Sequence, residues 1–155
     1  MLSQKISLGK IIGLILVLIF VLSLGYFKIR EYYLPTAQIK IGGQILMVDL
    51  AQNPAAWQKG LSGRKSLAEN QGMLFVFPLA SRRAFWMKDM NFSIDIIWIN
   101  EGKIVDIAPN LKPSMLDPLP VYSPRLPANL VLEVAAGFSQ KNELKIGDSL
   151  ELLTK

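Results

Sequence analysis

Two acidic residues stand inside segments that are otherwise strongly apolar. Asp95 lies within residues 94–99, IDIIWI, and Glu133 lies within residues 129–136, NLVLEVAA. Runs of β-branched and aromatic residues of this length are typical of buried strands. A buried carboxylate needs a charged or hydrogen-bonding partner, because an isolated charge away from water is unstable. Asp95 and Glu133 are therefore the first candidates for a functional site.

Arginines in two polar stretches are the candidate partners of these carboxylates. We predict that Asp95 is buried against an arginine, with Arg64 as the first choice and Arg83 as the second. In a structural interpretation, the pair fixes a loop on the sheet. In a functional interpretation, the charged groups line a groove together with aromatic side chains. The candidate ligand-binding residues are Arg64, Arg83, Trp86, Asp95, Tyr122 and Glu133.

The composition narrows the chemistry that such a site could perform. The chain has no histidine and no cysteine, which removes the usual general base, the commonest metal ligand and any thiolate nucleophile. A hydrolase that uses Asp95 and Glu133 as its two carboxylates remains an alternative, although the sequence does not fix their separation. We predict no metal site and no cofactor, since the remaining acidic residues form no close Asp-x-Asp loop.

The elements that must position these residues centre on residues 72–100. This stretch contains an apolar run at residues 73–77, two arginines that lead into three large apolar residues at 82–87, and a β-branched and aromatic run with one carboxylate at 94–99. Their closeness in sequence predicts three consecutive strands in a meander that forms the core sheet.

Further elements can be read on both sides of this stretch. Gly42 and Gly43 between two apolar runs predict a hairpin with a tight turn. Asn53-Pro54 is typical of a helix cap followed by the first helical position, so a short helix is expected from residue 55 to about 60. The remaining expectations are a loop at 62–71, strands at 103–108, 129–136 and 149–153, a proline-rich loop at 109–127 and a helical turn within 138–144.

The N-terminal residues 1–33 have the pattern of a membrane segment. Residues 11–27 carry no charge, and lysine or arginine flanks the run on both sides. We predict an uncleaved anchor with the N-terminus inside and the following domain outside, in the periplasm or at the cell surface. A cleaved signal peptide is the alternative, because Ser23-Leu24-Gly25 offers small residues at a possible cleavage site. The predicted division is an anchor at 1–33, a tether at 34–37 and a globular domain at 38–155.

The predicted domain is nearly neutral, unlike the whole chain. The chain has a formal net charge of +5, but residues 38–155 hold 13 basic and 11 acidic residues. A nucleic-acid surface needs a clustered basic stripe, which this segment lacks. We therefore expect no nucleic-acid partner and a monomer, with an unidentified small molecule, glycan or protein as its ligand.

Several short motifs follow one another in a fixed order along the chain. They are GLSGR at 60–64, GMLFVF at 72–77, FWMK at 85–88, IDIIWI at 94–99, VLEV at 131–134 with Gly137, and IGD at 146–148. Together these motifs resemble the domain of unknown function family 192. The resemblance covers residues 38–153 and departs from the family pattern at Ser62, Asp89-Met90 and Ser93-Ile94. It implies a compact β-rich domain and no particular reaction.

The combined prediction is a mainly β protein preceded by a single transmembrane helix. The domain is expected to be a small open β-barrel or sandwich with one short helix. Its predicted role is that of a non-enzymatic ligand-binding or accessory module. The alternatives are the hydrolase of Asp95 and Glu133, or a purely structural domain.

Overall fold

A computed structural model describes residues 7–32 and 34–154 of the chain. The chain divides into two compact units, Met1–Tyr33 and Leu34–Lys155.

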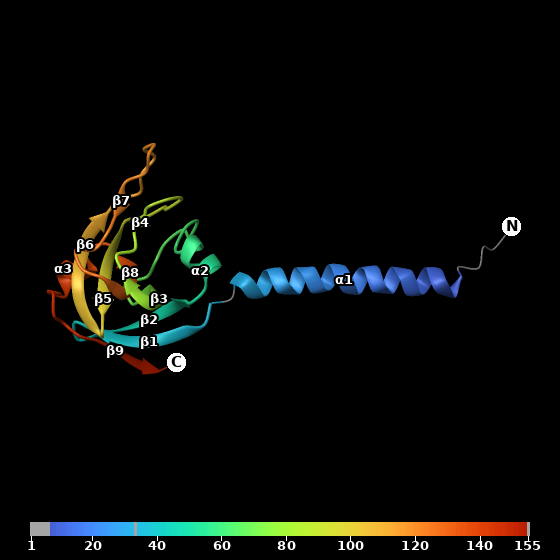
Figure 1. Ribbon diagram of the computed structural model, residues 1–155, viewed down its shortest axis with the longest axis horizontal. Helices are drawn as coiled ribbons and strands as arrows, with labels where there is room; N and C mark the ends of the chain where they lie inside the picture. Colours follow the sequence, from blue (N-terminus) through green and yellow to red (C-terminus); the bar gives the residue numbers. More distant parts are fainter. Residues whose placement is uncertain (1–6, 33, 155) are drawn as a thin grey trace. The chain divides into compact units, whose positions relative to one another are not determined.

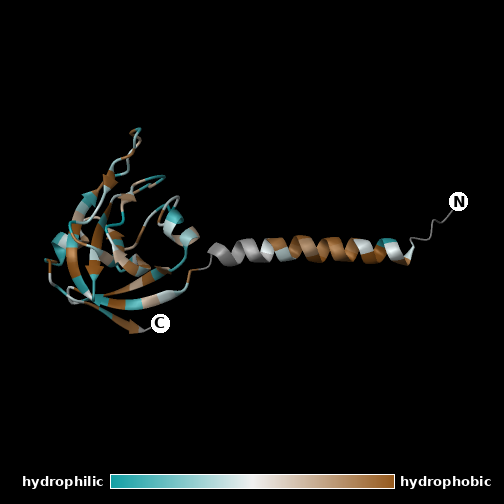
Figure 2. Ribbon diagram, in the orientation of Figure 1, coloured by the Kyte–Doolittle hydropathy of each residue, from teal (hydrophilic) through white to brown (hydrophobic). Residues whose placement is uncertain are grey.

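The first unit contains one long apolar helix, α1 (Leu8–Tyr32). Its 25 residues are about 37 Å long at 1.5 Å per residue, enough to cross the hydrocarbon core of a bilayer. By length and composition, the stretch Leu8–Gly25 is long and apolar enough to cross a membrane. A signal sequence near the N-terminus has the same properties. Figure 2 shows the apolar residues on all sides of this helix.

The second unit is built on a seven-stranded sheet that curls into a partly closed barrel (Figure 1). The strand order is β6-β5-β8-β3-β2-β1-β9, and every pair is antiparallel except β2 with β3. The two ends of the sheet meet where Lys103 bridges Ser149 and the Ile104 N–H donates to the Asp148 carbonyl at 2.9 Å. The strands are β1 (Thr36–Ile41), β2 (Gln44–Ala51), β3 (Gln71–Ser81), β5 (Ile94–Asn100), β6 (Lys103–Leu111), β8 (Ala128–Ala135) and β9 (Leu150–Thr154).

This topology confirms the mainly β prediction and corrects the predicted meander. β3 and β5 are not neighbours, because β8 from the C-terminal part of the chain lies between them. The segment expected as the middle strand instead leaves the main sheet. It forms β4 (Phe85–Trp86), which pairs only with β7 (Val121–Tyr122) in a separate two-stranded sheet.

The local predictions around β1 and β2 are confirmed. Gly42 and Gly43 both have positive φ, at 55° and 77°, as the tight turn of this hairpin requires. Helix α2 (Pro54–Lys59) carries the chain from β2 to its parallel neighbour β3. Its cap is Asn53, whose Oδ1 accepts the Ala56 N–H at 2.9 Å, and Pro54 follows as the first helical residue.

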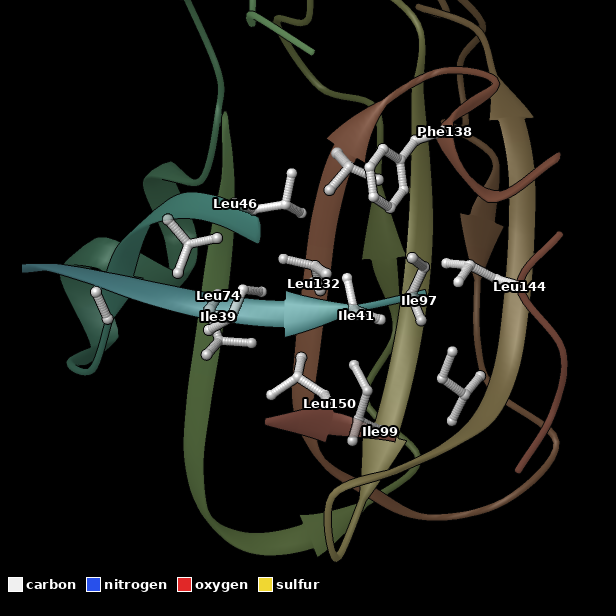
Figure 3. Close-up of a cluster of buried hydrophobic side chains, with 14 of the residues drawn as sticks. Ile39, Ile41, Leu46, Leu74, Ile97, Ile99, Leu132, Phe138, Leu144 and Leu150 are labelled. Atoms are coloured by element: carbon white, nitrogen blue, oxygen red, sulfur yellow. The ribbon is translucent and has the colours of Figure 1, made fainter. Parts of the chain in front are cut away.

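The central strands are apolar on both faces because the sheet has two covered sides. Along β5, Ile97 and Ile99 contribute to a core on the inner face of the curled sheet, whereas Ile96 and Trp98 contribute to a core on the outer face. Figure 3 shows the inner-face side chains converging between the strands. The outer face is covered by α2, by the loop that follows it and by the β4–β7 sheet, whose residues join the second core.

The proline-rich segment is less regular than the rest of the domain, as expected, but it is fixed at defined points. Strand β6 runs to Leu111, further than predicted, and β7 interrupts the loop. The Asp106 carboxylate accepts three hydrogen bonds from Arg125, one from its backbone N–H and two from its guanidinium, at 2.7–3.1 Å. The Arg82 Nε–H donates to the Pro124 carbonyl at 2.8 Å. These bonds attach the end of the loop to the sheet.

Candidate functional site

A pocket of about 500 Å³ opens on the outer face of the sheet, and Glu133 is its one carboxyl-bearing residue among those that the structure describes. We call it the Glu133 pocket. The register aligns Asp49, Met73, Glu133 and Ile96 in one row across β2, β3, β8 and β5. The lining comes from α2, the loop after it, β3, the β3–β4 segment, β4, the β4–β5 segment and β8. It consists of Pro54, Trp57, Gln58, Lys59, Gly60, Leu61, Ser62, Phe75, Phe77, Arg83, Ala84, Phe85, Trp86, Met90 and Glu133.

Aromatic side chains form most of the pocket wall. Phe75 and Phe77 alternate with inner-face residues of β3 and so lie on the same face as Met73. The Phe75 ring meets the Phe85 ring edge-on at 5.2 Å, and the Trp57 and Phe77 rings are 4.9 Å apart. These contacts fix the orientation of the wall, since such ring pairs are individually stabilising.

Arg83 lies over this aromatic wall. Its guanidinium carbon is 4.3 Å from the centre of the Phe77 ring and 5.9 Å from that of Trp57, a cation–π arrangement. Its Nε is buried and has no hydrogen-bond partner within the part of the chain that the structure describes. A guanidinium held on an aromatic face with an unused donor is suited to binding an anionic or carbonyl group.

Glu133 is the buried acid of the pocket. Its side chain is 5% exposed, and its Oε2 finds no hydrogen-bond partner among residues 7–32 and 34–154. Burial raises the pKa of Glu133 to about 8, although the nearby Arg64 guanidinium acts to lower it. The carboxyl is therefore largely protonated at neutral pH. A buried acid with a perturbed pKa in a cleft is a candidate for ligand contact.

The loop after α2 passes close to Glu133, and hydrogen bonds hold this loop in place. Gly60 has a φ of 49°, and a Cβ there would lie 3.4 Å from the Phe75 ring and 3.9 Å from Glu133 Oε2. The Ser62 hydroxyl donates to the Lys88 carbonyl at 2.8 Å, and the Gly63 N–H donates to the Asp89 carbonyl at 2.8 Å. These bonds connect the floor of the pocket to the β4–β5 segment.

The predicted pairing of Asp95 with an arginine is wrong. Arg64 instead pairs with Asp49 at 2.5 Å, in a bridge whose side chains are 35% and 26% exposed. Asp95 and Val134 are register partners on β5 and β8, which places Asp95 on the inner face, whereas Asp49 and Arg64 lie on the outer face. The sheet itself therefore separates Arg64 from Asp95.

Asp95 is satisfied by backbone groups. Its side chain is fully buried, and it accepts N–H groups of Asn110 at 2.8 Å, Gly137 at 3.0 Å and Ser139 at 2.8 Å. Two of these donors lie at the start of α3 (Phe138–Lys141), where helix N–H groups lack partners of their own. Asp95 thus joins β5 to the end of β6 and to α3, which is a structural role.

Only some of the predicted site residues come together in space. Arg83, Trp86 and Glu133 line the same pocket, with Trp86 half exposed at 50%. Arg64 does not line it but acts on the Glu133 charge, as its effect on the pKa of Glu133 shows. Tyr122 pairs with Phe85 and packs on the outer core without lining the pocket, and Asp95 lies on the other face.

The sequence-based prediction missed Trp57, Phe75 and Phe77, which form much of the wall. The alternation of β3 puts Phe75 and Phe77 on one face, and that signal was available in the sequence. The alignment of that face with Glu133 depends on β8 pairing with β3, which is a long-range feature.

The comparisons with known proteins show the family of the domain and structures with a similar fold, but they assign it no activity. No curated protein sequence matches the chain. A solved structure from Sinorhizobium meliloti 1021, provisionally described as a transcription regulator, is similar with a TM-score of 0.69 and 28% identity, and covers 77% of this chain and 95% of its own. A protein of unknown function from Novosphingobium aromaticivorans DSM 12444 is similar with a TM-score of 0.68 and 26% identity, covering 76% of this chain and 84% of its own. The family described as DUF192, Uncharacterized ACR, matches residues 37–152, and the chain belongs to that family.

Proposed function

We propose that the domain is a non-enzymatic binding module and that the Glu133 pocket is its ligand site. One observation carries this proposal. The Nε of Arg83 and the Oε2 of Glu133 are both buried without a hydrogen-bond partner in the described chain, and both residues line one aromatic pocket. Leaving a buried polar group unpaired costs about 1–3 kcal/mol, so two in one pocket point to a ligand that satisfies them.

The contrast with the other buried acids supports this interpretation over a purely structural one. Asp95 accepts three backbone N–H groups, and Asp106 is bonded to Arg125 and to the Ile107 N–H. Both acids thus have the partners that a structural carboxylate needs. Glu133 Oε2 does not, although Glu133 is buried to a similar degree.

The arrangement of the acids also favours binding over hydrolysis by a carboxylate pair. Such hydrolysis requires both carboxyl groups to flank one bond of the substrate. Asp95 lies on the inner face of the sheet and Glu133 on the outer face, since Asp95 pairs with Val134 and Glu133 pairs with Ile96. No single substrate could contact both.

We further propose that α1 anchors the chain in a membrane and that the domain lies on the outer side. The apolar length of the helix and the basic residues on both sides of its apolar run support the anchor. The free amino terminus, which adds positive charge before the run, and Glu31, which reduces the positive charge after it, support the orientation. The near balance of 13 basic and 11 acidic residues in 38–155 supports a small ligand rather than a nucleic acid.

The binding proposal can be tested by blocking the pocket. Ala84 is exposed and lines the pocket, so Ala84→Trp would fill it without touching the core. Ala80→Trp places the same side chain at an exposed position outside the lining and is the matched control. The full chain in a non-ionic detergent is screened with small apolar acids, amides and amines for a rise in Tm.

We expect compounds that stabilise the wild type and Ala80→Trp but leave Ala84→Trp unchanged. A compound that stabilises all three proteins equally binds elsewhere. If no compound distinguishes Ala84→Trp from its control, the pocket is not the ligand site and the proposal is wrong.

A further inference from the structure

More basic than acidic side chains line the Glu133 pocket. Its lining holds Lys59 and Arg83 as basic residues, and Glu133 as its one acid among the described residues. Arg64 lies close enough to act on Glu133, and its own charge is matched by Asp49. Because burial raises the pKa of Glu133, that acid carries little negative charge at neutral pH. The pocket therefore presents net positive charge to a ligand.

The three ionisable side chains of the lining, those of Lys59, Arg83 and Glu133, all carry hydrogen-bond donors at neutral pH. A guanidinium has only N–H donors, and a protonated carboxyl adds an O–H donor. The Ser62 hydroxyl donates elsewhere, to the Lys88 carbonyl. Two unused groups that can both donate, one from Arg83 and one from Glu133, call for an acceptor between them.

Five aromatic residues contribute flat apolar surface to the lining. Trp57, Phe75, Phe77, Phe85 and Trp86 offer ring faces and edges. A volume of about 500 Å³ lies in the range of small-molecule sites, which combine an apolar wall with a few polar groups.

These features together identify a class of ligand. Given that the pocket is the ligand site proposed above, we infer that it binds small organic monocarboxylates with an aromatic or flat apolar body. The carboxylate lies between the Arg83 guanidinium and the Glu133 carboxyl. The body packs against the aromatic wall. No bond is made or broken in this process.

The test compares three compounds that share a phenyl ring on a short alkyl chain and differ in the polar group at its end, which is anionic, neutral or cationic. 3-Phenylpropionate, 3-phenylpropionamide and 3-phenylpropylamine are titrated at pH 7 into the full chain in a non-ionic detergent, with binding followed by calorimetry. We expect the carboxylate to bind at least about tenfold more tightly than the amide and the amine.

Arginine variants show whether the preference arises where we place it. Arg83→Gln should remove most of the preference for the carboxylate. Arg82→Gln is the matched control, since Arg82 is the neighbouring arginine, is exposed and bonds to the Pro124 carbonyl outside the pocket. It should leave the three affinities unchanged.

The possible failures can be told apart. If the amide or the amine binds as tightly as the carboxylate, and Ala84→Trp abolishes that binding, the ligand class is wrong and the pocket is still a binding site. An equal loss of affinity in Arg82→Gln and Arg83→Gln contradicts the placement of the carboxylate. If no compound of any charge shows binding that Ala84→Trp removes, both the ligand class and the binding proposal fail.

Discussion

Asp95 and Glu133 lie on adjacent strands of one sheet but on opposite faces of it. The register pairs Asp95 with Val134 and Ile96 with Glu133, so the two carboxyl groups point away from each other. Asp95 is enclosed by backbone N–H groups, whereas Glu133 lies in an aromatic pocket and its Oε2 has no hydrogen-bond partner among the residues that the structure describes. Two acids that look equivalent in the sequence therefore have different surroundings in the fold.

Asp95→Asn should strongly destabilise the domain. The amide keeps one acceptor and replaces the other with a donor, which leaves at least one of the three backbone N–H groups unpaired in a buried place. We expect a loss of about 3 kcal/mol in the free energy of unfolding, measured by urea denaturation. Asp89→Asn is the control, because Asp89 is exposed and asparagine tolerates its φ of 54°. A loss below about 1 kcal/mol would show that Asp95 is not held in this way.

Combining Asp95→Asn with Arg64→Ala tests whether the two wild-type side chains are apart. Because the sheet lies between Asp95 and Arg64, the effects of Asp95→Asn and Arg64→Ala should add within about 0.5 kcal/mol. If the double mutant is clearly more stable than the sum of the two single-mutant losses in the free energy of unfolding predicts, the two side chains are in contact. That outcome would contradict the observed pairing of Arg64 with Asp49.

Glu133 should make stability fall as pH rises from about 5 to 8. Its pKa is about 8 in the folded protein against an ordinary value of 4.5, so the folded state holds a proton that the unfolded state has lost. Between these values the free energy of unfolding should fall by about 1.4 kcal/mol per pH unit. Above about pH 8 the dependence should level off. Glu133→Gln should remove this slope, whereas Glu151→Gln on the exposed side of β9 should keep it. A slope that survives in Glu133→Gln would assign it to another group.

Asp106 should hold the proline-rich loop in place. Burial acts to raise the pKa of Asp106, but the hydrogen bonds from Arg125 and Ile107 and the Arg125 charge together outweigh it and keep that pKa below its ordinary value. Asp106→Asn weakens these bonds, and hydrogen exchange in residues 112–125 should then rise several-fold while β3 and β5 stay protected. Glu101→Gln, in the exposed turn before β6, is the control. Unchanged exchange in the loop would mean that its other contacts are sufficient.

The anchor proposal predicts a defined topology. A reporter that is active only outside the cytoplasm, fused after Lys155, should be active, and the protein should remain with membranes after a carbonate wash. A shortened protein in the soluble fraction would instead indicate cleavage of a leader near Gly25. An inactive reporter on an intact, membrane-bound chain would reverse the proposed orientation.

The sequence was sufficient to predict most of the individual elements. The paired glycines of the β1–β2 hairpin, the Asn53 cap of α2 and the apolar strands β3, β5 and β8 act through local geometry. The order of strands was not predictable in the same way, because β8 enters between β3 and β5 from far along the chain. The meander that proximity in sequence suggested was wrong for that reason.

The candidate site was predictable only in part, for the same reason. The apolar neighbours of Asp95 and Glu133 in the sequence predicted that both acids are buried, which the structure confirms. The arginines and Trp86 were chosen by residue type. Which carboxylate meets which partner depends on the face of each strand and on its register with neighbours from other parts of the chain. A buried acid can also be satisfied by backbone groups, as Asp95 is, and backbone donors leave no trace in residue types.

The central claim is that a carboxylate ligand binds beside the protonated acid Glu133, and proton uptake on binding tests it most directly. At pH 8, near its pKa, Glu133 is about half protonated, and a bound anion beside it should drive it to the protonated form. Calorimetry with 3-phenylpropionate in two buffers of different ionisation enthalpy measures the protons exchanged. We predict an uptake approaching about half a proton per bound ligand in the wild type and none in Glu133→Gln. Binding without proton uptake, or with proton release, in the wild type would contradict the account.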